Sequence, residues 1–87
     1  QLNQVISQRK NDDPKESYTA SLFAKDISRS AQKVGEEGVE VALAAVKQDI
    51  DELKNESADL LYHLLVLLQR SETDISQVVK VLEQRHK

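Results

Sequence analysis

The chain has 87 residues, which limits it to one domain and excludes a pair of catalytic domains. Hydrophobic residues make up 39% of it, charged residues 31% and aromatic residues 3%, so a disordered polymer and a turn-rich all-β protein are both excluded. The net charge of −3 conceals an acidic centre, because residues 36–59 hold eight acids and two bases, a local balance of −6. We expect residues 1–87 to form a single all-α domain.

The acidic centre bears on the kind of partner. The rest of the chain carries seven acids and ten bases, a balance of +3. This distribution argues against nucleic-acid binding, which favours a basic stripe with interleaved aromatic residues. It favours a divalent cation that joins the acids to a polyanionic small molecule, because a bound metal reverses the sign of the local field.

The termini and the cysteine content bear on location. Without Cys the chain forms no disulfide and no thiolate metal site, which fits a reducing compartment. Residues 1–10 lack the basic start and apolar run of a signal peptide, so we expect a cytoplasmic protein. Because the sequence begins with Gln1 rather than Met, N-terminal sequence is expected to be missing or to belong to a preceding domain.

Two short helices are predicted first along the chain. The apolar spacing predicts a helix from about Leu2 to Lys10, and the Asn-Asp-Asp-Pro run at 11–14 ends it. One of the hydroxyl residues at 17–19 is placed to cap a second helix over residues 20–25.

Two long helices and a shorter one follow. The long helices are predicted from about residue 30 to residue 48 and from about residue 51 to residue 70. After residue 74, apolar residues recur at helical spacing and predict a last helix. The fold class is therefore an all-α bundle of about five helices, two of them long.

The second long helix contains the run 60–68, which is apolar on every face except at His63. Nine residues are too few to span a bilayer, which takes about 20, so this run must be buried in protein. A small chain with two short helices barely covers it, so we expect a homodimer that buries the run, with no membrane contact. A monomer with this helix at its centre is the alternative.

Glu36, Glu37 and Glu40 share one sector of the predicted first long helix. On the helical wheel Glu40 lies about 40° and Glu37 about 100° from Glu36, and apolar residues flank the sector on both sides. Residues 36–46 contain no base, whereas a solvated acidic face would place Lys or Arg one turn away. Clustered carboxylates between two buried arcs cost free energy unless a cation compensates them.

The second long helix carries a matching polar stripe. Its members recur one turn apart and are Glu52, Glu56, Asp59 and His63. A short connection makes the two long helices antiparallel, so Glu37 and Glu40 can face Glu56 and Asp59. Four carboxylates then form a pocket of oxygen ligands, which suits Mg²⁺ or Mn²⁺ and is poor for Zn²⁺. An exposed acidic face without a metal is the alternative.

These motifs resemble those of a known family. The segment Gly35-Glu36-Glu37-Gly38-Val39-Glu40, followed after fifteen residues by Glu56-Ser57-Ala58-Asp59, resembles the EExxE and ExxD signature of the MazG-like all-α nucleoside-triphosphate pyrophosphohydrolases. The stretches 9–14, 17–20, 33–37 and 60–68 narrow the likeness to the phosphoribosyl-ATP pyrophosphohydrolases of histidine biosynthesis. The resemblance covers nearly the whole chain.

The resemblance implies a fold and an activity. The fold would be a MazG-like helical bundle built as a homodimer. The reaction would be Mg²⁺-dependent hydrolysis of 1-(5-phosphoribosyl)-ATP to 1-(5-phosphoribosyl)-AMP and diphosphate. In some members the domain is fused to a phosphoribosyl-AMP cyclohydrolase domain, which would account for a chain that lacks an initial Met, and free-standing members also exist.

The resemblance also implies roles for the acids. The metal ligands would be Glu37, Glu40, Glu56 and Asp59, and Glu36 would support them or bind a second metal. The wheel alone does not choose between Glu36 and Glu37. Either of these two is a candidate for the catalytic base that accepts a proton from water.

Other side chains are candidates for binding substrate. Lys33, one turn before the glutamates, is the best-placed cation for diphosphate oxygens, although it can equally be a solvated base. The weaker candidates are Arg9, Lys10 and Lys25. Tyr18 can stack on a base or a ribose, or simply pack in the protein. His63 is expected to be a structural histidine hydrogen-bonded to an acid or a carbonyl, with a supporting role behind the metal ligands as the alternative.

Two rival functions stay open at this point. The first is an enzyme of the same fold that removes noncanonical or excess nucleoside triphosphates, and the stretches 9–14 and 17–19 argue against it. The second is a helical dimerisation module without catalysis, whose acids are only solvated.

Overall fold

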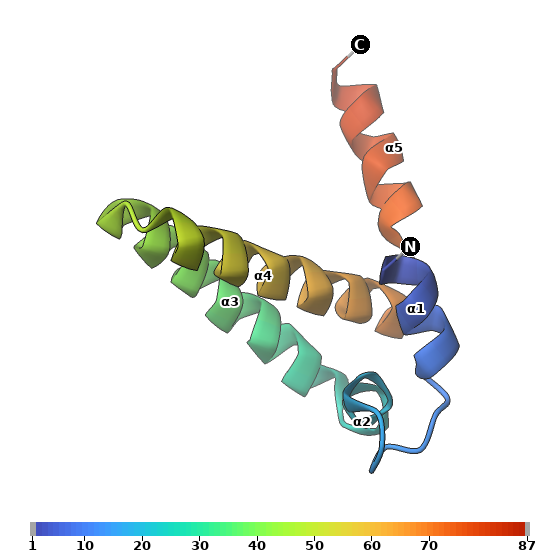
Figure 1. The fold of residues 1–87 in the computed structure, drawn as a ribbon. Helices are drawn as coiled ribbons and strands as arrows, with labels where there is room; N and C mark the ends of the chain where they lie inside the picture. Colours follow the sequence, from blue (N-terminus) through green and yellow to red (C-terminus); the bar gives the residue numbers. More distant parts are fainter. Residues whose placement is uncertain (1, 87) are drawn as a thin grey trace.

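The computed structural model describes residues 2–86, and within them the chain forms five α-helices (Figure 1). These are α1 (Leu2–Arg9), α2 (Tyr18–Ala24), α3 (Ile27–Lys47), α4 (Ile50–Arg70) and α5 (Ile75–Arg85). The prediction of an all-α fold with two long helices is confirmed. The helices α2 and α3 begin two and three residues earlier than the sequence pattern predicted.

Short polar side chains fix where three of the helices begin. The Ser17 hydroxyl accepts a hydrogen bond from the backbone N–H of Ala20 at 3.2 Å, so it is the predicted cap of α2. The Asp49 carboxylate accepts from the N–H of Glu52 at 3.0 Å and caps α4 in the same way. Asp74 accepts from the N–H groups of Ser76 and Gln77 at the start of α5.

The two long helices end in the same manner, on a residue in the left-handed backbone region. Gln48 follows α3 with φ 61°, and Glu72 follows the last turn of α4 with φ 63°. After α4, the Glu72 N–H donates to the Gln69 carbonyl at 3.1 Å and the Thr73 N–H donates to the Leu68 carbonyl at 2.9 Å. This pair of bonds is the Schellman arrangement, at whose left-handed position Gly is the usual residue.

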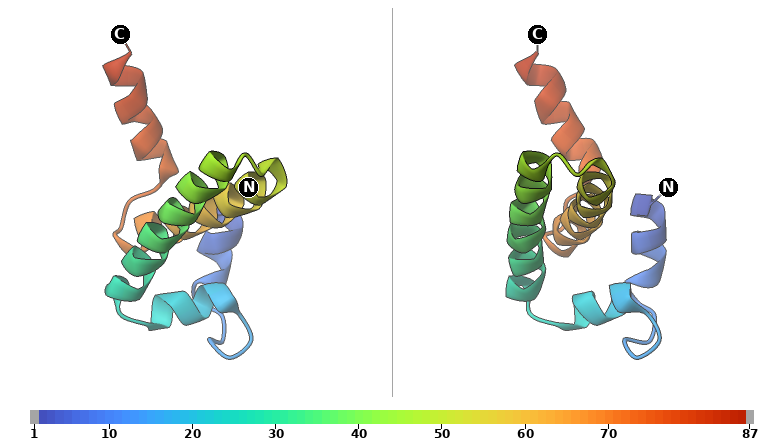
Figure 2. Two further views of the ribbon diagram at one scale, coloured as in Figure 1. Left: turned by 90° about the vertical axis from the view of Figure 1, so that its left-hand side faces the viewer. Right: turned by 60° about the vertical axis from the view of Figure 1, so that its left-hand side comes forward.

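The helices α3 and α4 form an antiparallel hairpin, α1 and α2 pack near the end opposite its turn, and α5 extends away (Figures 1 and 2). The hydrophobic core lies at that end and consists of Ile6 from α1, Leu22 from α2, and Leu65 and Val66 from α4. In residues 31–62, which make up most of the hairpin, Ala44 is the one buried residue. The chain therefore has a packed end and a thinly packed hairpin.

Large apolar side chains stay uncovered on this chain. On the hairpin, Val46 of α3 is 81% exposed and Leu61 of α4 is 54% exposed. The run 60–68 is thus buried only in part, at His63, Leu65 and Val66. The helix α5 points away from the hairpin and has no buried residue in the described part of the chain (Figure 1). No helix within residues 2–86 combines the length and apolar character that crossing a membrane requires.

Candidate metal centre and its surroundings

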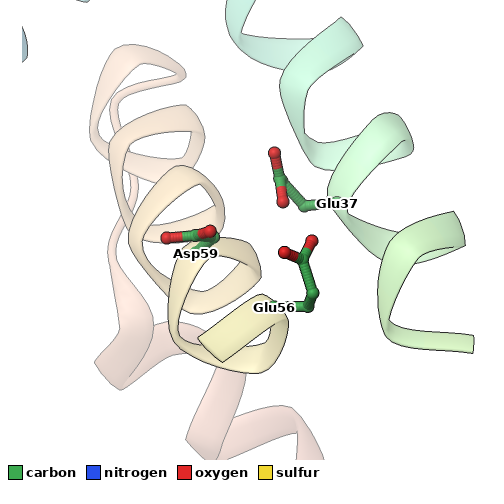
Figure 3. A group of neighbouring side chains, drawn as sticks. All are labelled: Glu37, Glu56 and Asp59. Carbon is green, nitrogen blue, oxygen red and sulfur yellow. The ribbon is translucent and has the colours of Figure 1, made fainter. Parts of the chain in front are cut away.

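Three carboxylates converge across the middle of the hairpin. Glu37 extends from α3 toward Glu56 and Asp59 on α4 (Figure 3), and one oxygen from each of the three lies within 4.8 Å of the others. Glu56 and Asp59 lie one turn apart on one side of α4, and the antiparallel course of the hairpin brings Glu37 opposite them. Glu37 and Glu56 are half-buried and Asp59 is exposed, so the group is open to solvent on one side. We call these three residues the carboxylate group.

The fourth predicted ligand lies outside this group. Glu40 is exposed and stands one turn further along α3 than Glu37. Its negative charge still acts on Glu56 and contributes to raising the pKa of that residue. The structure therefore brings three predicted ligands together and places the fourth close by.

Electrostatic repulsion within the carboxylate group is visible at Glu56. Its pKa is raised above the ordinary value of 4.5, first because burial penalises the charged form and next because of a hydrogen bond with Glu37. The negative charges of Glu37, Glu40 and Asp59 raise this pKa further. The acids are thus held together at a cost that a cation would relieve, and their oxygen donors suit a hard divalent ion.

Lys33 supplies the base that residues 36–46 lack. Its ammonium group lies 3.6 Å from the Glu37 carboxylate and 3.9 Å from that of Glu36. Glu36 also accepts a hydrogen bond from Gln32 at 3.0 Å, is exposed, and lies outside the carboxylate group. The structure thus separates the two glutamates that the helical wheel left equivalent.

The remaining acid of the α4 stripe is engaged at the hairpin turn. The Lys47 ammonium lies 2.9 Å from a Glu52 carboxylate oxygen. This hydrogen-bonded contact, together with the charge of Glu52, raises the pKa of Lys47. Glu52 therefore ties the end of α3 to the start of α4 and takes no part in the carboxylate group.

His63 lies one turn beyond Asp59 and is 6% exposed. Burial and the charge of Lys33 lower its pKa, so the imidazole is neutral at pH 7. Its Nδ1 is buried and finds no hydrogen-bond partner within residues 2–86, so the hydrogen bond that a structural histidine was expected to make is absent at this atom.

Tyr18, Tyr62 and His63 form an aromatic cluster. The ring of Tyr18 stacks on Tyr62, with centroids 6.1 Å apart and planes at 21°, and meets the edge of His63 at 6.0 Å. Tyr62 is fixed by a 2.6 Å hydrogen bond between its hydroxyl and that of Thr19. Because Tyr18 stays 54% exposed, one face of the cluster is open to a ligand.

The other basic candidates differ in their surroundings. Arg9 and Lys25 are exposed and line neither of the described cavities. Lys10 is half-buried and lines a cavity of about 510 Å³ at the packed end of the molecule. Arg70 lines the same cavity, and sequence reasoning missed it. The sequence does contain one sign of Arg70. It follows Asp59 by eleven residues, or about three helical turns, so both residues lie on one side of α4.

Comparison with known proteins identifies the class to which this all-α fold and its acidic motifs belong. The phosphoribosyl-ATP pyrophosphohydrolase family model matches residues 1–86. The chain belongs to the phosphoribosyl-ATP pyrophosphohydrolase family, as its resemblance to those proteins implied.

Several curated relatives carry the name histidine biosynthesis bifunctional protein HisIE, and three of them illustrate the similarity. The protein from Vibrio cholerae serotype O1 is 60% identical over 87 residues, which are 100% of this chain and 41% of that relative. The relative from Yersinia pestis is 57% identical over 86 residues, 99% of this chain and 42% of the relative. The relative from Escherichia coli O157:H7 is 56% identical over the same shares. The chain thus spans about two fifths of the length of these relatives.

Proposed function

We propose that the chain hydrolyses 1-(5-phosphoribosyl)-ATP to 1-(5-phosphoribosyl)-AMP and diphosphate, an early step of histidine biosynthesis. Membership of the family over residues 1–86 supports this substrate. The observation that carries the chemistry is the convergence of Glu37, Glu56 and Asp59 within 4.8 Å. A pair of antiparallel helices that presents three carboxylates to one point is suited to a reaction on a phosphoric anhydride.

The proposal includes Mg²⁺, with Mn²⁺ as a substitute. Glu37, Glu56 and Asp59 would hold the ion, and Glu40 is near enough for its charge to reach Glu56. The donor set fits, because all its atoms are carboxylate oxygens and because their repulsion raises the pKa of Glu56 when no cation is present. When bound, the ion supplies charge neutralisation for the departing diphosphate and lowers the pKa of a water molecule.

The chain's own residues position the reactants and move the proton. Glu36 is exposed and lies outside the carboxylate group, so it is not committed to the ion and is the first candidate to accept a proton from water, once its contacts with Gln32 and Lys33 give way. Glu37 is the alternative acceptor. Lys33 lies within 4 Å of both glutamates and thereby places a positive charge where diphosphate oxygens would arrive. The open face of Tyr18 offers a stacking surface to the adenine.

The proposal places the chain in a larger cytoplasmic assembly. The relatives are named bifunctional and the chain spans about two fifths of their length, which supports a fusion to a phosphoribosyl-AMP cyclohydrolase domain. A homodimer is part of the same proposal, because exposed apolar residues such as Val46 and Leu61 lie on the hairpin.

Diphosphate release tests the proposal. The chain is incubated with Mg²⁺ and either phosphoribosyl-ATP or an ordinary deoxynucleoside triphosphate, and the two rates are compared. We expect preference for phosphoribosyl-ATP. Preference for the deoxynucleoside triphosphate would assign the chain to nucleotide clearance, and no release from either would leave the dimerisation module as the function.

A further inference from the structure

A second candidate site lies at the packed end of the molecule. The cavity of about 510 Å³ lies between the 10–14 segment, α2 and the C-terminal end of α4, away from the hairpin turn. Its volume is in the range of about 300 to 1,000 Å³ that small-molecule sites occupy. A smaller cavity of about 250 Å³ adjoins it and shares Lys10, Gln69 and Glu72 with it. The proposed reaction uses none of these residues.

The two cations of the cavity lack protein partners. Neither Lys10 nor Arg70 forms a salt bridge in the described part of the chain, although Asp12 and Glu72 line the same cavity. The Nε atom of Arg70 is buried and has no hydrogen-bond partner within residues 2–86. A buried guanidinium donor without a protein acceptor is satisfied by water or by a ligand, and the oxygen of an anionic ligand in this cavity would accept its hydrogen bond.

Glu72 contributes the second carboxylate of the cavity lining, beside that of Asp12. It occupies the left-handed position after α4, with φ 63°, where Gly would be free of the strain that a side chain imposes. Its side chain lines both cavities. Gln48 has the same backbone conformation after α3 and lines neither cavity, so this φ belongs to the helix end, and only the place of Glu72 in the lining bears on binding.

The composition of the cavity selects a class of ligand. Lys10 and Arg70 suit a phosphate group, which Arg can bind through two parallel hydrogen bonds. Asp12 and Glu72 would repel a bare anion, but they accept hydrogen bonds from hydroxyl groups. Phe23, together with Ala20, contributes an apolar wall against which the C–H face of a sugar can pack. A ligand with one phosphate and several hydroxyls satisfies all three features.

We propose that this cavity binds a ribose 5-phosphate group, with its phosphate on Lys10 and Arg70 and its hydroxyls on Asp12 and Glu72. The group has two sources, either the phosphoribosyl end of the substrate or a free sugar phosphate. Arg70 lies on the Asp59 side of α4 and about 16 Å further along it. In phosphoribosyl-ATP the triphosphate and the phosphoribosyl group are attached at opposite ends of the adenosine, so one molecule can reach toward both sites. This first source rests on the proposed function.

Direct binding tests the site without reference to catalysis. Ribose 5-phosphate is titrated into the full chain while the Arg70 Nε–H resonance is followed by NMR, with ribose and inorganic phosphate as separate controls. We expect the resonance to shift and ribose 5-phosphate to bind at least tenfold more tightly than either control. Equal affinity of all three probes, or no shift, overturns the proposal, whatever the outcome of the diphosphate assay.

Variants assign the binding to these side chains. Arg70→Gln is expected to weaken ribose 5-phosphate binding at least tenfold, whereas Arg85→Gln, an exposed Arg on α5, is expected to leave it unchanged. If Arg70→Gln does not fold, Glu72→Gly is used instead. Gly suits that backbone position, and the variant lacks the carboxylate that would accept a hydrogen bond from a ligand hydroxyl. Unchanged affinity in the folded variant overturns the proposal.

Inhibition kinetics distinguish the two sources. Competition between ribose 5-phosphate and phosphoribosyl-ATP, with a KM raised at least tenfold by Arg70→Gln and kcat little changed, identifies the substrate's own phosphoribosyl end. Binding that is lost in Arg70→Gln but does not compete with the substrate identifies a free sugar phosphate. Both results support the site.

Discussion

The pKa of Glu56 reports the repulsion within the carboxylate group. This folded-state pKa is raised by burial, by the hydrogen bond with Glu37 and by neighbouring charges. A raised carboxyl pKa means that the folded chain holds the proton more tightly than the unfolded chain. The stabilisation this provides is complete below the ordinary pKa of 4.5 and is lost as the pH rises through the raised folded value.

Glu56→Gln therefore has an effect on stability that depends on pH. The variant removes the repelled charge, so the metal-free protein is expected to melt at a higher temperature than the wild type at pH 7. Below pH 4.5 Glu56 is largely protonated in both states and the difference shrinks. Thermal melts with a chelator at several pH values check this. If the gain in melting temperature of Glu56→Gln grew toward acidic pH, the pKa of Glu56 would not be raised in the folded chain.

Neutralising other members of the carboxylate group tests the metal. Asp59→Asn and Glu37→Gln are expected to lower Mg²⁺-dependent diphosphate release by at least about 100-fold. This exceeds the usual effect of mutating residues that only support the metal ligands. The same loss is expected for Glu40→Gln, because the family resemblance implies that Glu40 is the fourth ligand of the ion. Mg²⁺ should raise the melting temperature of the wild type but not of Asp59→Asn.

Glu83→Gln is the matched control for these variants, because Glu83 is exposed on α5 and lies outside the carboxylate group. It should keep both activity and the Mg²⁺-dependent shift. If Asp59→Asn retained most of its activity, the ligand set would be wrong.

The helix ends show a second kind of local strain. Gln48 and Glu72 occupy left-handed positions, a conformation that costs a non-Gly residue about 1 kcal/mol or more. Gln48 lines neither described cavity, so nothing described opposes replacement. Gln48→Gly is expected to stabilise the chain by about 0.5 to 1 kcal/mol, measured by urea unfolding. A destabilised variant would show that the Gln48 side chain contributes an interaction of its own.

The sequence predicted the helices well and the site in part. Periodicity and caps placed the hairpin, and its antiparallel course brought Glu37 opposite Glu56 and Asp59. The i,i+4 spacing of Lys33 and Glu37 permits an ion pair but equally a solvated Lys33, so the sequence left their pairing open. Arg70 was missed because its surroundings come from residues 10–14, and no local period reveals that this segment returns to the end of α4.

The whole chain leaves apolar surface that a second copy would cover. Leu61 is 54% exposed on α4, in a run whose composition predicts burial. If the hairpin pairs with its counterpart, Leu61→Glu buries a charge at the interface and is expected to give a monomer. Analytical ultracentrifugation checks this, with Ser28→Glu, an exposed site near the start of α3, as the control that should keep the dimer. A wild type that sediments as a monomer would refute the homodimer.

The uneven packing of the molecule has a consequence for its motions. The core joins α1, α2 and the end of α4, whereas the half of the hairpin near Gln48 and Asp49 has Ala44 as its one buried residue. Backbone amides there should exchange with deuterated solvent sooner than those near Leu65 in the metal-free protein. Since Mg²⁺ would clamp α3 to α4 at the boundary between these halves, its addition should slow exchange around residues 40–56 and leave the protected end unaltered. Binding of Mg²⁺ would then be coupled to ordering of the half of the hairpin near Gln48 and Asp49.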